Sequence, residues 1–305
     1  MRKTLWALVI ALSAGCTSVP LNKNYKGPMP LPQEYNLLTA PRKPEAISFV
    51  LLEEQQNYSV YSLTIDGSKS IFYLPRKSRH EKSPVIFITP GIGGGEVVNN
   101  ILAQGCVDND LAAIVLDQPS FLDPENNGQE LELIFEQATR NSRAIIDWIY
   151  TQPNLDHSRI GSIGYSMGAI RNMILAAVEP RVKSHVFIMG GGNLPEIILE
   201  SLETQNYVWQ RKKKEHLDDS QLINDLENII LDPADLAPYI NARDVLMVIS
   251  RFDAIVPTRR QEEIRILMGG PKTIYIPTGH TTGAITIYYL RKKMVEFYKQ
   301  EFSQE

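Results

Sequence analysis

The sequence predicts an α/β protein with a mostly parallel, doubly wound sheet. Along most of the chain, short apolar runs with the composition of buried strands alternate with longer stretches of helical spacing. Three β-rich stretches near the start follow one another without helices between them, which adds antiparallel strands to one part of the sheet. The alternation is interrupted once, by a segment with its own helical patterns, and this indicates a small helical insert.

The elements follow from these patterns in order. The run from Pro84 to Thr89 is continuously apolar, as in a strand buried on both faces of a parallel sheet. Strands are expected at residues 46–52, 58–65, 70–74, 84–89, 111–117, 159–163, 182–189, 244–250 and 273–277. Helices are expected at residues 129–150, 169–177, 259–268 and 284–302.

The predicted insert covers residues 190–242, with helices at 195–203 and 221–231. It follows the C-terminal end of a strand, where ligand clefts lie in open α/β sheets, so we interpret it as a lid or pocket wall. The basic run at residues 211–214 is expected to form a solvated helix face. The alternative for this run is contact with anionic lipid head groups, assisted by Trp209.

The N-terminus has the features of an export signal. Basic residues at positions 2 and 3 precede an apolar run that is too short to span a bilayer. The run ends in Leu12-Ser13-Ala14-Gly15-Cys16, which resembles the lipobox of bacterial lipoproteins, although Ser13 replaces the usual leucine. The resemblance implies a signal peptide over residues 1–15 and a lipid on Cys16, which would anchor an exported protein to a membrane. The alternative is an ordinary cleaved signal with an incidental cysteine.

Residues 16–44 hold six prolines and little apolar periodicity. This composition predicts a tether that separates the anchor from a folded domain over residues 45–305. Packing of this segment on the domain surface is the alternative. Cys106 is the other cysteine, so no intrachain disulfide forms if Cys16 carries a lipid. Cys106 lies in an apolar, helix-like stretch and is expected to pack as a small hydrophobe.

The overall composition is that of an ordinary soluble domain. The chain has 305 residues, of which 43% are hydrophobic and 22% charged, and neither disorder nor a multispanning membrane protein is indicated. The formal net charge of −4 offers no basic field for nucleic acid.

The pentapeptide Gly164-Tyr165-Ser166-Met167-Gly168 lies between a predicted strand and a predicted helix. In this context, glycines around a serine allow a sharp turn that raises the hydroxyl above the sheet. A serine hydroxyl is a poor nucleophile at neutral pH, so it needs a base within hydrogen-bond reach and a third group to orient that base. The alternative is a glycine-rich turn with no catalytic role.

Position along the chain selects the base and the acid. When a catalytic serine, acid and histidine follow one another in that order along the chain, the histidine comes last. His280 meets this condition, because it follows the last predicted strand, and its loop lies at the same sheet edge as Ser166. Asp253 follows the preceding strand. Asp117 also ends a strand, but it precedes the serine and ranks lower. His185 lies in an apolar strand pattern that is typical of a structural histidine. As alternatives, Asp253 caps a helix and His280 is a surface residue.

The glycine-rich segment 90–96 follows the buried strand that ends at Thr89. It lacks the lysine and hydroxyl residue of a phosphate-binding P-loop, and its spacing does not match a dinucleotide-binding motif. An oxyanion hole is the better interpretation, with backbone N–H groups of this loop acting together with the N–H of Met167.

From about residue 83 to the C-terminus, the chain resembles an α/β-hydrolase, in particular the dienelactone-hydrolase-like and acyl esterase branches. Gly164-Tyr165-Ser166-Met167-Gly168 matches the nucleophile elbow, Asp253 with Ile255-Val256-Pro257 matches the acid loop, and Gly279-His280 matches the base loop. Pro90-Gly91-Ile92-Gly93 occupies the position of the oxyanion loop, where many relatives begin with His-Gly.

The resemblance implies a serine hydrolase that cleaves carboxylic esters through an acyl-enzyme. Ser166 would attack, His280 would take its proton, and Asp253 would stabilise the imidazolium; the N–H groups of Met167 and Ile92 would bind the oxyanion. No metal or organic cofactor is expected, and the substrate is a small-molecule or lipid-like ester. An acyltransferase, a peptidase or a non-catalytic ligand-binding lipoprotein are the alternatives, and the oligomeric state stays open.

Overall fold

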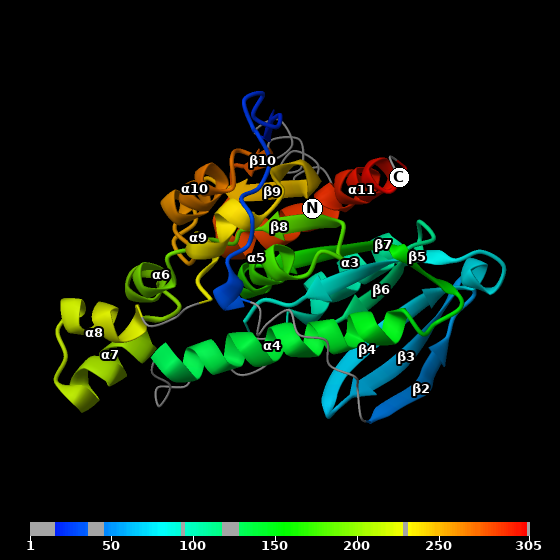
Figure 1. Ribbon diagram of the computed structural model, residues 1–305, viewed down its shortest axis with the longest axis horizontal. Helices are drawn as coiled ribbons and strands as arrows, with labels where there is room; N and C mark the ends of the chain where they lie inside the picture. Colours follow the sequence, from blue (N-terminus) through cyan, green and yellow to red (C-terminus); the bar gives the residue numbers. More distant parts are fainter. Residues whose placement is uncertain (1–15, 36–45, 93–94, 118–127, 228–230, 304–305) are drawn as a thin grey trace, which may run out of the picture.

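A 10-stranded sheet runs through the protein in the computed structural model, which describes residues 16–35, 46–92, 95–117, 128–227 and 231–303 (Figure 1). The strands are β1 (Thr17–Val19), β2 (Ile47–Glu54), β3 (Tyr58–Ile65), β4 (Ser68–Pro75), β5 (Ser83–Thr89), β6 (Ala112–Val115), β7 (Leu155–Tyr165), β8 (Ser184–Ile188), β9 (Val245–Ser250) and β10 (Lys272–Ile276). The predicted signal peptide, residues 36–44 of the predicted tether and Gly93 lie outside the described residues.

The strand order is β1-β10-β9-β8-β7-β5-β6-β4-β3-β2. Neighbouring strands from β10 to β6 are parallel, whereas β4, β3 and β2 continue the sheet as an antiparallel meander. The predicted mostly parallel sheet with antiparallel N-terminal strands is therefore confirmed. The carboxyl ends of the parallel strands share one edge of the sheet, and loops after β5, β7, β9 and β10 meet there.

Helices cover both faces of the sheet. The longer ones are α3 (Glu96–Val107), α4 (Gly128–Ile149), α5 (Met167–Val178), α10 (Thr258–Leu267) and α11 (His280–Glu301). Side chains of α3 and α11 pack on one face, and those of α4, α5 and α10 pack on the other. Buried residues recur along α4 with the three- and four-residue spacing of an amphipathic helix.

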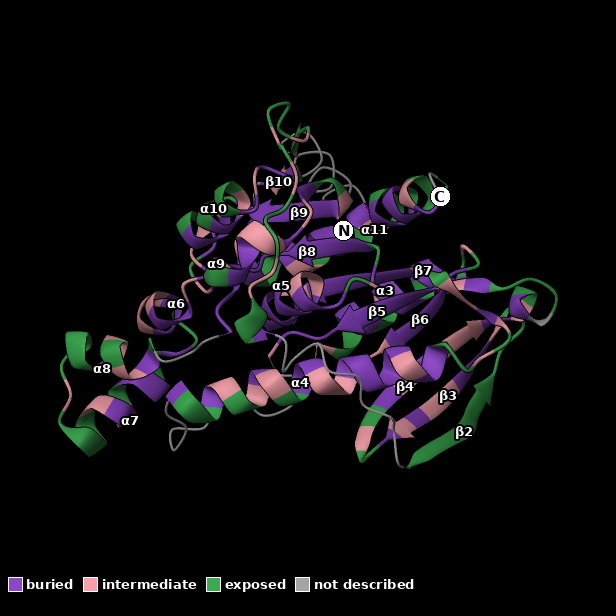
Figure 2. Cartoon of the chain, viewed as in Figure 1, coloured by how far each residue is buried: buried purple, intermediate pink, exposed green. Residues whose placement is uncertain are grey.

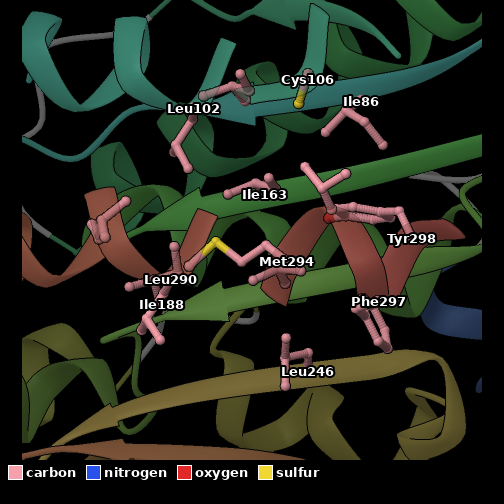
Figure 3. Close-up of a cluster of buried hydrophobic side chains, with 14 of the residues drawn as sticks. Ile86, Leu102, Cys106, Ile163, Ile188, Leu246, Leu290, Met294, Phe297 and Tyr298 are labelled. Atoms are coloured by element: carbon pink, nitrogen blue, oxygen red, sulfur yellow. The ribbon is translucent and has the colours of Figure 1, made fainter. Parts of the chain in front are cut away.

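The core under α3 and α11 is drawn in Figure 3, where Leu102 and Cys106 of α3 face Ile86 and Ile163 of the central strands. Met294, Phe297 and Tyr298 of α11 fill the space beside them. Cys106 is 1% exposed, which confirms the prediction that it packs as a small hydrophobe. Apolar side chains of this size each contribute roughly 1.5–3 kcal/mol when fully buried, so the core supplies the driving force for folding.

The N-terminal segment belongs to the domain. β1 forms one edge of the sheet and pairs antiparallel with β10, with Thr17 opposite Tyr275. The chain then crosses the protein: Tyr25 packs beside the α10 cluster, and the ring of Tyr35, in the short 3-10 turn η1 (Gln33–Tyr35), is buried among residues of α4 and α5. The prediction of a tether leading away from the domain is therefore wrong for residues 17–35, because backbone pairing and aromatic burial hold them against it.

The helical insert lies between β8 and β9, as predicted. It contains α6 (Leu194–Glu200), α7 (Gln205–Glu215), α8 (Asp219–Leu226), α9 (Pro233–Leu236), and the 3-10 turns η3 (Ala237–Tyr239) and η4 (Ala242–Asp244). The basic run 211–214 lies on α7. Arg211 is buried and pairs with Glu215 and with Asp225 of α8, so the prediction of a solvated face holds only for the lysines.

β2 is exposed along its whole length at the far edge of the sheet (Figure 2). The 3-10 turn η2 (Arg76–Arg79) follows β4. None of the described helices is long and apolar enough to cross a bilayer.

Candidate active site

Ser166 sits at the sharp turn between β7 and α5. Its backbone has φ 55° and ψ −124°, a region that non-glycine residues rarely occupy. The two flanking glycines explain how the turn closes. A Cβ on Gly164 would lie 2.3 Å from the carbonyl oxygen of Gly168, and a Cβ on Gly168 would lie 1.9 Å from that of Thr89. Only glycine fits at these two positions, and the turn lifts the serine above the carboxyl ends of the strands.

His280 begins α11, directly after the loop that follows β10, and its side chain reaches Ser166. The His280 Nε2 atom lies 2.8 Å from Ser166 Oγ, and His280 Nδ1 lies 2.7 Å from Asp253 Oδ2. Because Nδ1 faces a carboxylate, it carries the ring proton, and Nε2 is left to accept from the serine hydroxyl. All three residues are buried, at 5–7% exposure.

Asp253 is held by four donors. Its Oδ1 accepts from the backbone N–H groups of Ile255 and Val256, each at 2.9 Å, and its Oδ2 accepts from His280 and from Nε2 of Gln261 at 2.9 Å. Gln261, on α10, is fully buried. Its Nε2 also donates to Val256 O, and its Oε1 accepts from Ser250 N. This glutamine was missed in the sequence, where it lies among charged residues in a polar helix.

The predicted oxyanion loop lies against the serine. A Cβ on Gly91 would be 3.2 Å from Ser166 Cβ and 3.0 Å from the ring of Tyr165, so the loop approaches the turn closely. Met167 is the first residue of α5, and its N–H belongs to the first-turn amides that have no partner within the helix. Ile92 and Met167 line the same small cavity as Ser166. Their role as oxyanion donors stays a prediction.

Tyr165 forms part of the wall beside the histidine. Its ring centroid lies 5.5 Å from that of His280. Burial, together with the charges of Asp253 and Glu203, raises the pKa of the Tyr165 phenol to about 12, so the group stays neutral over the physiological range.

The cavity beside Ser166 has a volume of about 30 Å³ and an almost entirely apolar lining. The insert supplies one wall and the α5 start and acid loop supply the others. Its apolar lining comprises Ile92, Met167, Ile170, Leu194, Ile197, Ile198, Ile255 and Val256. A larger cavity of about 260 Å³ lies elsewhere, between Asp66, Asp117 and Arg171. We place the site at the smaller cavity because Ser166, whose hydroxyl contacts His280, lines it.

The other candidates in the sequence are not at this site. Asp117 lines the larger cavity, and its backbone carbonyl accepts hydrogen bonds from Arg171. His185 is buried in β8, with Nδ1 2.9 Å from Ser162 Oγ, which confirms its structural role. Burial lowers the pKa of His185 to about 3. Among the described residues, no group of histidine, cysteine and acidic side chains is arranged to hold a metal.

Solved structures share this architecture. An acetyl xylan esterase from Paenibacillus sp. R4 is similar with a TM-score of 0.66 and 19% identity, covering 85% of this chain and 92% of its own. Acetyl xylan esterase 1 from Thermoanaerobacterium sp. JW/SL YS485 has a TM-score of 0.62 and 17% identity, over 90% and 99%. A glucuronoyl esterase from Solibacter usitatus has a TM-score of 0.53 and 12% identity, over 86% and 88%.

No protein-family model matches the sequence, and comparison with curated proteins finds no significant match. At sequence identities of 12–19%, the structural similarity shows a shared fold and not a shared function. The sheet order, the sharp turn at Ser166 and the loops that meet at the carboxyl edge agree with it. The chain therefore has the α/β-hydrolase fold.

Proposed function

We propose that the protein is a serine-dependent carboxylic ester hydrolase. One observation carries the proposal: Ser166 Oγ, His280 and Asp253 form an unbroken chain of hydrogen bonds at 2.8 and 2.7 Å, on the carboxyl edge of the sheet. A nucleophile, a base and an orienting acid in this order are what acyl transfer from an ester requires.

The geometry supports a two-step reaction. Ser166 Oγ attacks the ester carbonyl carbon while His280 Nε2 takes the hydroxyl proton, and Asp253 stabilises the imidazolium through Nδ1–H. When the tetrahedral intermediate collapses, the imidazolium gives its proton to the leaving alkoxide, and the acyl group stays on the serine. A water molecule then attacks the acyl-enzyme with His280 again as base, which releases the acid and restores Ser166.

The negative oxygen of the intermediate needs donors beside Ser166. The N–H groups of Met167 and Ile92 are the proposed donors, because both residues line the cavity into which the serine opens. Loss of one such donor typically raises the barrier by roughly 3 kcal/mol, which is about a hundredfold in rate.

The small apolar cavity favours a short acyl group. A space of about 30 Å³ accepts one or two heavy atoms, which is the size of an acetyl methyl group. A longer acyl chain would have to displace buried isoleucines of the insert. The acetyl xylan esterases among the similar structures are named for the removal of the same group, and this adds support to a short acyl substrate.

Hydrolysis of a series of p-nitrophenyl esters tests this proposal. We expect the acetate to be the best substrate and kcat/KM to fall as the acyl chain lengthens. Ser166→Ala should lose at least roughly 10⁴-fold in kcat, because it removes the hydroxyl that His280 Nε2 contacts. Ser162→Ala, which removes a buried serine of the preceding strand β7, is the matched control and should keep turnover. Equal rates for Ser166→Ala and the wild type would refute the proposal.

We also propose that the protein is exported and lipidated at Cys16. The lipobox resemblance of residues 12–16 supports this assignment. The mass of the protein extracted from membranes tests it, because a lipid on Cys16 adds the mass of its acyl chains, and the signal peptide is removed.

A further inference from the structure

We propose that the surface around Phe252 and the first half of α11 is a membrane-docking surface that rests on an anionic lipid bilayer and turns the mouth of the site toward it. The docking surface consists of Phe252, Ile285, Tyr288, Tyr289, Lys292 and Lys293. The proposal deepens the proposed function and rests on the lipid anchor at Cys16.

The position of Cys16 leaves no length of chain between the anchor and the domain. Thr17, the next residue, already pairs with Tyr275 in the sheet. Cys16 itself is half-buried against the core under α11. Burial raises the pKa of its thiol, and the nearby Lys293 ammonium opposes this effect. One residue spans about 3.5 Å, so lipid chains on Cys16 hold this edge of the sheet at the level of the head groups.

This anchor point lies at the catalytic edge of the sheet. Because β1 runs antiparallel to β10, Cys16 lies next to the carboxyl end of β10, four residues before His280. Arg251 connects the two regions: its Nη2 donates to Thr17 Oγ1 at 2.8 Å, and its backbone N–H donates to Ile276 O. The next residue, Phe252, donates its N–H to Thr278 O at 3.0 Å, beside the histidine loop.

Large apolar and aromatic side chains are exposed around this point. Phe252 is 71% exposed although it directly precedes the buried Asp253. On α11, Ile285, Tyr288 and Tyr289 are each 45–57% exposed and recur at the three- and four-residue spacing that places them on one face. Tyrosine and phenylalanine at a protein surface suit the boundary between head groups and acyl chains.

The charge of the same face favours anionic lipid. From Thr281 to Lys293, α11 contains three basic residues and no acidic one. Arg291 stacks over the ring of Tyr288 at 3.7 Å, while Lys292 and Lys293 are exposed on the next turn. Each basic residue near an anionic surface adds to the attraction, and a basic patch combined with a lipid anchor is the usual arrangement for stable attachment.

Docking through this surface would orient the site. His280 is the first residue of α11, so a bilayer in contact with the first half of this helix lies near the histidine that contacts Ser166. Esters presented at the membrane surface would then reach the serine without leaving the lipid–water boundary. The short acyl pocket would receive the acyl group, and the alcohol part would remain toward the lipid.

The experiment places a fluorescent probe at two matched exposed isoleucines of the full chain. Ile285→Cys marks the docking surface, and Ile266→Cys, on α10 over the opposite face, is the control with 66% exposure. Cys106 is fully buried with its pKa raised to about 12, so a maleimide–NBD probe reacts at the introduced cysteine once Cys16 carries lipid. The lipidated proteins are reconstituted into vesicles of phosphatidylcholine and phosphatidylglycerol in equal parts.

We expect the probe at position 285 to shift its emission to the blue, and nitroxide-labelled lipids to quench it severalfold more than the probe at position 266. Lys292→Glu combined with Lys293→Glu should reduce this quenching. Equal quenching at the two positions, stronger quenching at 266, or a chain without lipid on Cys16 would overturn the proposal. Hydrolysis of p-nitrophenyl acetate on the same vesicles reports the esterase function separately, since this soluble ester needs no docking.

Discussion

Ser166 owes its position to backbone geometry that its neighbours enforce. The serine adopts φ 55° at a turn where the backbones approach closely. Gly164 and Gly168 allow this approach, because a side chain at either position would clash with the backbone of a neighbouring segment. The histidine, at the start of α11, and the aspartate, in the loop after β9, lie far along the chain, and each is held by buried hydrogen bonds. In the proposed reaction, a small displacement of any of these groups would lengthen the contact along which the proton moves, so the residues that position them also affect the rate.

Gln261 is the clearest positioning residue. In Gln261→Leu, Asp253 loses one donor and the buried N–H of Ser250 loses its acceptor. We expect kcat for p-nitrophenyl acetate to fall roughly 10- to 100-fold, with little change in KM, because the acid and base shift while the acyl pocket stays intact.

Steady-state kinetics measure kcat and KM separately and so test this prediction. Gln104→Leu, which removes side-chain hydrogen bonds from the surface of α3, is the matched control and should leave kcat unchanged. An unchanged kcat in Gln261→Leu, with normal stability, would show that Gln261 does not position Asp253.

The spacing of motifs identified Ser166, His280 and Asp253 because each follows a strand and their order is fixed along the chain. The structure brings these three together, and their catalytic role is a proposal. Gln261 could not be found in the same way. It lies between charged residues, and only tertiary packing of α10 against the acid loop shows that it is buried.

Among the secondary-structure elements, β1 and the segment after it differ most from the prediction. Proline-rich composition without periodicity is typical of a linker, and a strand of three residues gives no pattern. What holds this segment is specific to the tertiary structure: pairing with the edge of β10, and the hydroxyl of Tyr25, which donates to Ile240 O and accepts from Ala242 N.

Tyr25→Phe tests whether this segment stabilises the domain. The change leaves the backbone N–H of Ala242 and the carbonyl of Ile240 without this partner, so the free energy of unfolding should fall by about 1–2 kcal/mol in urea denaturation. Tyr58→Phe removes an exposed hydrogen bond to Gln104 and should cost less than about 0.5 kcal/mol. Equal stabilities of the two variants would mean that residues 17–35 contribute little.

Helix α7 illustrates why the insert was only partly predicted. Its sequence has low hydrophobicity and a basic run, which favoured a solvated face. Arg211 is nevertheless buried, because Glu215 and Asp225 provide carboxylates for its guanidinium and join α7 to α8. Glu215 lies on α7 itself, four residues after Arg211, but Asp225 lies on α8, and the sequence around the run does not indicate that second partner.

For the molecule as a whole, alternating strands and helices were enough to predict the class of sheet. Nearly all strands and long helices lie within a few residues of their expected bounds, but α3 was not among the helices expected. The closing pair β1–β10 depends on contacts between distant segments and has no local signal. Both faces of the sheet carry separate buried clusters, so the stability of the whole domain responds to groups far from the site.

His185 makes the global stability depend on pH. Its pKa is about 3 in the folded protein, against an ordinary value of 6.5, so the unfolded chain binds a proton that the folded protein excludes. Acidification from pH 6.5 towards 3 therefore destabilises the fold, by about 1.4 kcal/mol per pH unit. Between pH 7 and 5, the free energy of unfolding of wild type should fall by about 2 kcal/mol more than that of His185→Gln, as measured by urea denaturation. If the free energy of unfolding changed with pH in the same way for wild type and for His185→Gln, this prediction would be contradicted.

The central claim is that Ser166 is the nucleophile and that His280 activates it. Mass spectrometry of the protein treated with a fluorophosphonate tests this most directly, because the reagent bonds covalently to an activated serine. We predict one adduct per chain on the peptide that contains Ser166, none in Ser166→Ala, and much slower labelling in His280→Ala. An adduct on another residue, or equal labelling of wild type and Ser166→Ala, would contradict the account.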